Sequence, residues 1–216
     1  MHRLIPPALA AIAVLFTFTG CASTPAQPAE ASAAATPPAQ FNVIGRDDAP
    51  VTIIEFTDLQ CPYCARFARQ TFPQLKRDYV DTGKLRYTSR DLPLPFHSFA
   101  LPAAVASRCA GEQGRFWEYR EALFESQSLL GSEPYGRIAG QLGLDVEQLE
   151  ACRSNGEQAS NVRADLAMAA QHGIRSTPTF VIGRVVNGEF QGEVVSGAQP
   201  YEFFKAKLDA LLAEPR

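Results

Sequence analysis

A pair of cysteines separated by two residues stands where an apolar run is expected to pass into a helix. The motif Cys61-Pro62-Tyr63-Cys64 directly follows the apolar run 51–56. Two cysteines at this spacing can close a small disulfide ring. The free N–H groups and the dipole at a helix N-terminus stabilise the first thiolate, which is the form that attacks disulfides. The motif therefore predicts a redox pair, with half of a zinc site as the alternative.

The four residues of this motif are expected to play different parts. Cys61 lies nearer the helix start and is the better placed and more exposed nucleophile, whereas Cys64 lies one turn inside and would resolve a mixed disulfide. Pro62 presets the first helical turn without losing a needed hydrogen bond. Tyr63 lies beside the reactive sulfur, where it would contact a bound peptide. Because tyrosine brings no positive charge, we expect a less oxidising disulfide than a histidine there would give.

A second motif, Thr177-Pro178, opens another apolar run far downstream and favours redox chemistry over zinc binding. Only about 5–6% of bonds before proline are cis in folded proteins, so the base rate favours a trans bond. The proline, however, opens a strand after a long helical stretch and follows a CxxC motif. We therefore expect a cis bond, which would turn the Thr177 backbone toward the sulfurs, ready to pair with an extended substrate backbone.

Glu55 interrupts the apolar strand six residues before Cys61. If both faces of the sheet are covered, this carboxylate is buried and would accept and deliver the proton of Cys64 during exchange. The alternative is a solvent-facing glutamate at a sheet end, where most glutamates lie. We favour the buried, functional position.

The order of predicted elements indicates an α/β protein. Strand 51–56, a helix over 61–80 kinked near Pro73, and a parallel strand over 84–90 form a βαβ unit, which is typical of a helix-covered parallel sheet. A helical stretch, broken by glycine and proline, follows. Its predicted helices are 98–111, 114–125, 133–140, 145–154 and 157–171. The chain ends with strands 179–183 and 189–195, joined by a turn at Asn187-Gly188, and a helix at 200–212.

The remaining two cysteines of the expected folded domain are Cys109 and Cys152, 43 residues apart in the helical stretch. In an exported protein, such a pair most simply forms a structural disulfide between neighbouring helices. Two free buried thiols are one alternative. A four-cysteine zinc site shared with the CxxC is another, but such sites usually use two closely spaced pairs.

The N-terminus indicates export. The apolar stretch 8–18 is too short for a membrane span, which needs about 20 apolar residues. Together with the short basic start before it, this stretch predicts a signal peptide over 1–20. Small residues ending at Cys21 resemble the bacterial lipoprotein signal, in which this cysteine becomes lipidated. The alternative is an ordinary signal peptide cut near Ala22 or Ala26. Residues 21–40 are rich in Ala and Pro and predict a lipidated, disordered tether.

The folded domain is expected over 41–216. The net charge of −3 and a pI of about 5.7 exclude a basic nucleic-acid surface. Membrane contact would come from the lipid on Cys21 rather than from a polybasic surface. We expect no cofactor and no metal.

Together the motifs resemble the DsbA-like branch of the thioredoxin superfamily, the bacterial periplasmic disulfide oxidoreductases. The residues that carry the resemblance are 54–64, the Gln113–Trp117 segment, 173–180 and Gly197–Tyr201, which together span about 41–213. The resemblance implies a thioredoxin fold with a helical insertion at about 95–172. It also implies that Cys61 is the attacking sulfur, that Pro178 is cis and that Glu55 is the buried acid near Cys64.

The expected function is a dithiol oxidase in the periplasmic cell envelope. It would donate the Cys61–Cys64 disulfide to exported cysteine-containing proteins and be reoxidised by a membrane redox partner. A reductase or isomerase using the same residues is the close alternative, because sequence does not fix the relative stability of the two redox states. A tethered peptide-holding or metal-carrying module is a further alternative from a different class.

Overall fold

The computed structural model describes His2 and residues 40–214. Apart from His2 and Gln40, the predicted signal peptide at 1–20, the lipidation site Cys21 and the tether at 21–40 lie outside the described residues. Within the described part of the chain, no helix has the length and apolar character needed to cross a membrane.

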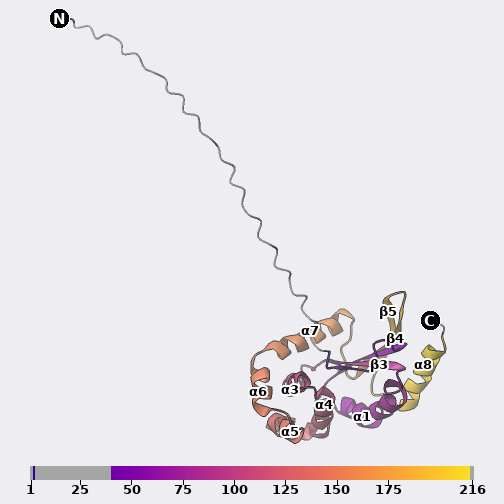
Figure 1. Cartoon of the computed structure of the whole chain (residues 1–216), viewed down its shortest axis with the longest axis horizontal. Coiled ribbons are helices and arrows are strands. Elements are labelled where there is room, and N and C mark those ends of the chain that lie inside the picture. The colour runs from indigo at the N-terminus through magenta and orange to yellow at the C-terminus, as the bar shows by residue number, and fades with distance from the viewer. Residues whose placement is uncertain (1, 3–39, 215–216) are drawn as a thin grey trace, which may run out of the picture. The chain divides into compact units, whose positions relative to one another are not determined.

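A five-stranded mixed sheet forms the centre of the domain (Figure 1). The strands are β1 (Val43–Ile44), β2 (Val51–Thr57), β3 (Leu85–Asp91), β4 (Thr179–Val186) and β5 (Glu189–Ser196), in the spatial order β1-β3-β2-β4-β5. β2 lies in the middle, parallel to β3 and antiparallel to β4, so the parallel pairing predicted from the βαβ order is confirmed. The two-residue strand β1 was not predicted, since so short a segment has no period to detect.

The predicted helix 61–80 is three pieces. These are α1 (Pro62–Gln70), α2 (Phe72–Leu75) and a π-helical turn (Lys76–Val80). The break falls at Thr71, beside Pro73, which has no N–H to bond to the preceding turn. The prediction of one continuous helix was therefore wrong, whereas the predicted kink near Pro73 is confirmed.

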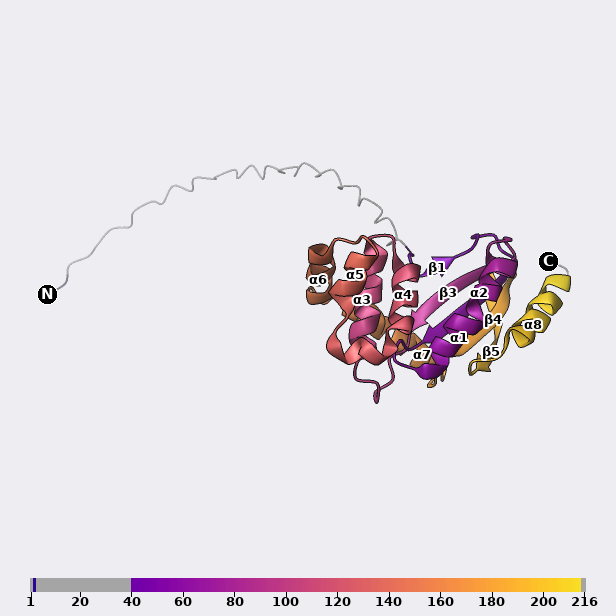
Figure 2. The same ribbon diagram turned by 90° about the horizontal axis from the view of Figure 1, so that it is seen from below.

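The remaining helices follow the predicted order. They are α3 (Ala100–Glu112), α4 (Phe116–Glu125), a 3₁₀ segment (Gln127–Ser132), α5 (Tyr135–Gln141), α6 (Val146–Ser154), α7 (Glu157–Gln171) and α8 (Tyr201–Ala213). Figure 2 shows α3, α4, α5 and α6 gathered beside the sheet, while α1 and α2 lie across it. This is the thioredoxin fold with a helical insertion that the sequence predicted.

Helices cover the sheet through alternating side chains of β2. On one face, Ile53 belongs to a cluster with Phe67 of α1, Phe180 of β4 and Phe204 of α8. The rings of Phe67 and Phe180 lie 4.5 Å apart between centroids. On the other face, Phe56 packs in a cluster that includes α7. Covering both faces makes β2 a buried strand, and any polar residue on it must find a partner inside the protein.

A buried charge network joins the insertion to the sheet. Arg108 of α3 donates to Asp91, at the end of β3, over 2.5 Å, and to Asp165 of α7. Asp165 also accepts from Arg90 over 3.0 Å and from the backbone N–H of Asp91. Two arginines thus face two carboxylates. Arg108, Asp91 and Asp165 are buried and Arg90 is partly exposed, and the network holds the insertion to the end of β3.

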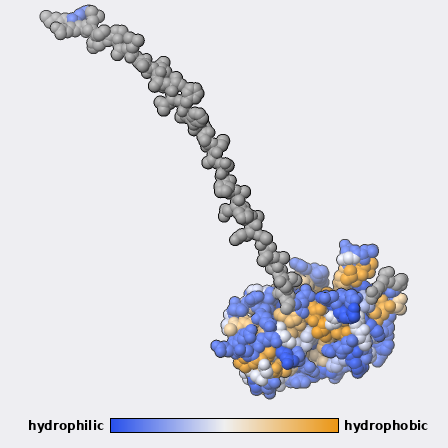
Figure 3. All heavy atoms as spheres, in the orientation of Figure 1, coloured by the Kyte–Doolittle hydropathy of each residue, from blue (hydrophilic) through white to orange (hydrophobic). Residues whose placement is uncertain are grey.

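The β4–β5 hairpin turns at Asn187-Gly188, as predicted. Both turn residues have positive φ, 53° and 84°, as a tight hairpin turn requires. The hairpin has four exposed large apolar side chains, Val185, Val186, Phe190 and Val194. Figure 3 shows an orange area on the projecting hairpin. The end of the hairpin therefore projects beyond the core.

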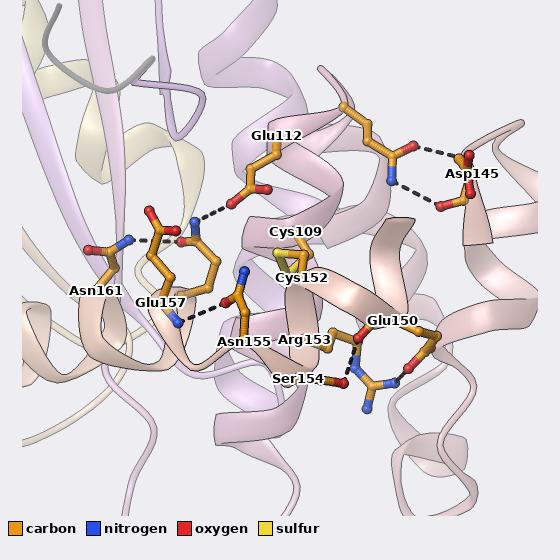
Figure 4. Close-up of a disulfide and its surroundings, with 12 residues drawn as sticks. Cys109, Glu112, Asp145, Glu150, Cys152, Arg153, Ser154, Asn155, Glu157 and Asn161 are labelled. Carbon is orange, nitrogen blue, oxygen red and sulfur yellow. Dashed lines mark hydrogen bonds and ion pairs between the residues drawn. A yellow bond between two sulfur atoms is a disulfide. The ribbon is translucent and has the colours of Figure 1, made fainter. Parts of the chain in front are cut away.

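A disulfide inside the insertion joins Cys109 of α3 to Cys152 of α6 (Figure 4). The two cysteines lie 1% and 6% exposed in the cluster of buried side chains that fills the insertion. Since their thiols are used in this bond, the four-cysteine zinc site and the pair of free thiols are both excluded for this structure.

We predict that replacing both Cys109 and Cys152 by serine lowers the free energy of unfolding by about 2–4 kcal/mol, because a 43-residue separation between crosslinked residues restricts the unfolded chain strongly. Urea unfolding of the oxidised parent and the double variant measures this difference. An unchanged midpoint would show that the disulfide contributes nothing to stability.

Candidate functional site

Cys61 caps the N-terminus of α1. It adopts an extended backbone with φ −73° and ψ 124°, and Pro62 occupies the start of the first helical turn. Neither cysteine of the pair is in a disulfide in this structure, so the site is in the dithiol state. The N–H of Asp58 donates to the Cys64 sulfur over 3.5 Å, which places the second sulfur under the loop that precedes the helix.

The Cys61 thiol is acidified by its surroundings. Its pKa falls from an ordinary value of 9.0 to about 5, first because the Cys64 thiol hydrogen-bonds to it. Thr177 and the backbone N–H groups of Cys64 and Tyr63 lower the pKa further, and burial opposes them. Burial raises the pKa of Cys64 well above 9.0. The first sulfur is therefore a thiolate at neutral pH, while the second stays a thiol.

The reactive sulfur is less accessible than the sequence suggested. Cys61 is 4% exposed and Cys64 is fully buried, so the predicted order is right but both side chains are buried. Tyr63, in contrast, is 57% exposed. The guanidinium of Arg66 lies 5.1 Å from its ring centroid, so a positive charge that the motif itself lacks does lie beside it. Sequence reasoning missed Arg66, although its position one helical turn beyond Tyr63 was a usable signal.

The cis peptide bond Thr177–Pro178 lies across from the redox pair. The Cys61 sulfur lies 3.5 Å from the Thr177 carbonyl oxygen, to which only its thiol form can donate, so the two motifs, 116 residues apart, meet at this sulfur. The buried Thr177 hydroxyl has no hydrogen-bond partner among the described residues. The N–H of Gly197 donates to the Pro178 carbonyl over 2.8 Å, which fixes this loop against the segment after β5.

Residues of the insertion hold the loop before Cys61, and none of these contacts was predicted. The buried Asp58 carboxylate accepts from the N–H of Leu94 and lies 2.8 Å from Nδ1 of His97. The Gln127 side chain donates to the carbonyls of Leu59 and Cys61 over 2.8 and 2.9 Å. The sequence suggested only a loop or cap role for His97. The residues in these contacts lie 36 to 68 positions apart in the sequence, and no local sequence pattern predicts contacts over such separations.

Glu55 is fully buried on β2, which excludes the solvent-facing alternative. Its Oε2 accepts hydrogen bonds from the Tyr87 hydroxyl over 2.9 Å and from Arg120 over 2.6 Å. Its Oε1 is buried without a hydrogen-bond partner. The carboxylate is therefore anchored through one oxygen and keeps the other as a free acceptor.

We predict that alkylation of reduced Cys61 by iodoacetamide reaches half its maximal rate near pH 5, since the rate follows the thiolate fraction. Because the folded pKa is depressed below 9.0, the thiolate stabilises the folded dithiol form fully above pH 9, and this stabilisation is lost as the pH falls to about 5. Mass spectrometry of a pH series measures the rate, with Cys64→Ser as the single-thiol comparison. A midpoint near pH 9 would contradict the assignment.

The thioredoxin family model matches residues 39–210. Among curated relatives, the chain is 34% identical over 173 residues to the Na(+)/H(+) antiporter NhaA 3 of Salinispora tropica, covering 79% of this chain and 26% of that protein. The chain thus spans about a quarter of the antiporter's length. It is also 29% identical to the disulfide bond formation protein D of Bacillus subtilis, covering 68% of this chain and 70% of the relative.

Two solved structures share this architecture. Wolbachia pipientis alpha-DsbA1 superposes with a TM-score of 0.68 at 27% identity, covering 79% of this chain and 89% of that one. BdbD from Bacillus subtilis, in its oxidised form, superposes with a TM-score of 0.67 at 27% identity, covering 80% and 93%. The family match, these structures and the fold agree. The chain belongs to the thioredoxin family, on its DsbA-like branch.

Proposed function

We propose that this protein catalyses thiol–disulfide exchange and donates the Cys61–Cys64 disulfide to exported cysteine-containing proteins. The observation that carries the proposal is the setting of Cys61. It is the N-cap residue of α1, its sulfur lies 3.5 Å from the Thr177 carbonyl oxygen, and its pKa is lowered to about 5. A thiol in this setting is both a nucleophile and a good leaving group at neutral pH. The name of the B. subtilis relative, disulfide bond formation protein D, supports the same direction.

The exchange proceeds through a mixed disulfide. A substrate thiolate attacks the Cys61 sulfur of the oxidised pair, the Cys61–Cys64 bond breaks, and Cys64 leaves as a thiolate that takes up a proton. A second substrate thiolate then attacks the substrate sulfur bonded to Cys61, so the substrate gains a disulfide and Cys61 leaves as its stabilised thiolate. Pro62, Tyr63, Thr177 and the cis Pro178 form the proposed peptide-binding surface around this sulfur.

The direction follows from the relative stability of the two redox states. Only the dithiol form contains the Cys61 thiolate, so the contacts that lower its pKa stabilise the reduced protein and make the disulfide more oxidising. Reoxidation then requires a membrane redox partner, which we include in the proposal. A reductase or isomerase using the same residues would require a more stable disulfide.

Glu55 is the proposed proton acceptor and donor for Cys64. Both residues are fully buried, and bulk water does not reach the Cys64 thiol. Oε1 of Glu55 has no hydrogen-bond partner among the described residues. Burial first, and then the nearby Glu55 and Cys64, raise the pKa of the Tyr87 hydroxyl, so both groups lie near this hydroxyl. A proton held on Oε1 would return to Cys64 when that sulfur leaves as a thiolate.

We predict that the oxidised soluble domain, from residue 41 onward, converts a reduced two-cysteine peptide to its disulfide, and that Cys61→Ser abolishes this activity. Cys64→Ser cannot hold the disulfide and should lack this activity too. With the disulfide form of the peptide, however, its Cys61 thiolate should accumulate a mixed disulfide, because no Cys64 thiol remains to resolve it. Thiol trapping and mass spectrometry measure both. If Cys61→Ser retained peptide binding while the parent showed no exchange, a peptide-holding module would be the better account, and stoichiometric Cu(I) binding lost in this variant would indicate a metal carrier.

We also propose that the protein is exported to the cell envelope and anchored by a lipid on Cys21. The support is the small-residue pattern that ends at this cysteine and the spacer that follows it. We predict that the full chain, expressed in a bacterial host, fractionates with membranes and that Cys21→Ala releases it to the soluble envelope fraction. A soluble parent chain, cleaved after Cys21, would support the ordinary signal peptide instead.

A further inference from the structure

The Thr57 hydroxyl is a buried polar group to which the proposed exchange gives no part. Thr57 is the last residue of β2 and is 2% exposed. Its hydroxyl makes no hydrogen bond of ordinary geometry with any of the described residues. Burying a hydroxyl without a partner costs free energy, because its hydrogen bonds to water are lost. Native proteins keep few such groups, and a role in catalysis is one reason to keep one.

The sheet directs the Thr57 side chain toward the helix that carries the redox pair. Side chains alternate along a strand, so Thr57 points to the same face of the sheet as Ile53. On that face Ile53 belongs to a cluster with Phe67 of α1. The fully buried Cys64 lies three residues before Phe67, on the same side of the helix. The hydroxyl therefore lies on the side of β2 that faces the second sulfur.

Two hydrogen-bond donors act on the Cys64 sulfur from this side. The N–H of Asp58 lies 3.5 Å from the sulfur. Burial, and then the neighbouring Cys61, raise the pKa of the Cys64 thiol well above 9.0. The Thr57 hydroxyl and the Asp58 N–H act in the opposite direction and lower this pKa. Because a hydroxyl hydrogen can rotate, Thr57 can donate to the sulfur once it becomes a thiolate.

The carboxylate of Asp58 fixes the backbone N–H of the same residue. Its Oδ1 accepts from the N–H of Gln60 over 2.7 Å. Its Oδ2 accepts from the N–H of Leu94 over 2.8 Å and lies 2.8 Å from Nδ1 of His97. A donor that is held in place before a charge develops needs little reorganisation when the charge appears.

We propose that the Thr57 hydroxyl and the Asp58 N–H form a two-donor site for the Cys64 thiolate, which exists only while this sulfur leaves or attacks. The inference rests on the proposed exchange function and adds to it the groups that stabilise the transient charge. When a substrate thiolate attacks Cys61, the bond between these two sulfurs forms and the Cys61–Cys64 bond breaks. The electron pair leaves on Cys64, where both donors meet it before the sulfur takes up a proton.

This role predicts slower exchange with an unchanged redox balance. Neither the disulfide form nor the dithiol form, in which Cys64 is a protonated thiol, contains the Cys64 thiolate. Removing the Thr57 hydroxyl should therefore leave the relative free energies of the two end states, and with them the reduction potential, unchanged. It should raise the barrier between them in both directions, because the hydrogen bond is made only when the sulfur is charged.

The test follows the reduced protein after mixing with glutathione disulfide, by acid quenching and mass spectrometry. Attack by Cys61 forms a mixed disulfide with glutathione, and attack by Cys64 then resolves it. In Thr57→Val, which replaces the hydroxyl by a methyl group, the first step should keep its rate. The second should slow about tenfold, as expected for the loss of one hydrogen bond to a charged group. Reduction of the oxidised variant by glutathione should slow by the same factor, and its reduction potential should not move.

Three comparison variants complete the design. Thr57→Ser keeps a hydroxyl and should retain most of the rate of the second step. Thr88→Val is the matched control, since Thr88 is also a buried strand threonine but pairs with Ile54 and so lies on the opposite face of the sheet. It should leave both steps unchanged. Thr57→Ala also removes the hydroxyl and carries the test if Thr57→Val does not fold.

Three outcomes would overturn the inference. One is a folded Thr57→Val that resolves the mixed disulfide at the parent rate. Another is a Thr57→Ser variant as slow as Thr57→Val, because the hydroxyl would then not be the active group. The third is a redox equilibrium constant that changes as much as the rate, since Thr57 would then stabilise an end state and not the thiolate. Absence of any mixed disulfide in the parent protein would instead refute the proposed exchange function.

Discussion

The site depends on one sulfur placed between a helix N-terminus and a carbonyl. Cys61 is the N-cap residue of α1, and its sulfur lies 3.5 Å from the Thr177 carbonyl oxygen and has the Cys64 thiol as a hydrogen-bond donor. The sheet makes this meeting possible, because β2 leads into α1 while β4, paired beside β2, begins directly after the cis proline. The ends of two neighbouring strands thus bring together motifs 116 residues apart.

Three side chains of the insertion contact the residues around this sulfur. Gln127 holds the carbonyls of the loop before α1, His97 contacts the Asp58 carboxylate of the same loop, and Arg120 reaches Glu55 beneath it. The Asp91–Arg108–Asp165 network fixes the insertion to the end of β3. These contacts make the helical segment part of the redox site as well as a cover for it.

Local patterns explain what the sequence predicted. The strand before the CxxC, the helix after it and the hairpin turn at Asn187-Gly188 each follow from adjacent residues, and the fold follows from their order. The cis proline was expected instead from its place in that order and from the family resemblance. The partners of Glu55 and of the active-site loop lie 32 to 68 residues away, where no spacing rule applies. For the same reason, no local signal in the sequence distinguishes Arg120, although it carries a buried charge.

The surroundings of Cys61 favour the reduced form of the cysteine pair. The reduction potential of the Cys61–Cys64 couple measures this preference. Equilibration of the folded domain with glutathione at pH 7, followed by thiol trapping, gives this value. A thiol pKa of about 5, against about 7 in thioredoxin, stabilises the dithiol by roughly 2 kcal/mol, or about 50 mV. We therefore expect a potential about 50 mV above the thioredoxin value of about −270 mV. A potential at or below the thioredoxin value would contradict the claim and indicate a reductase.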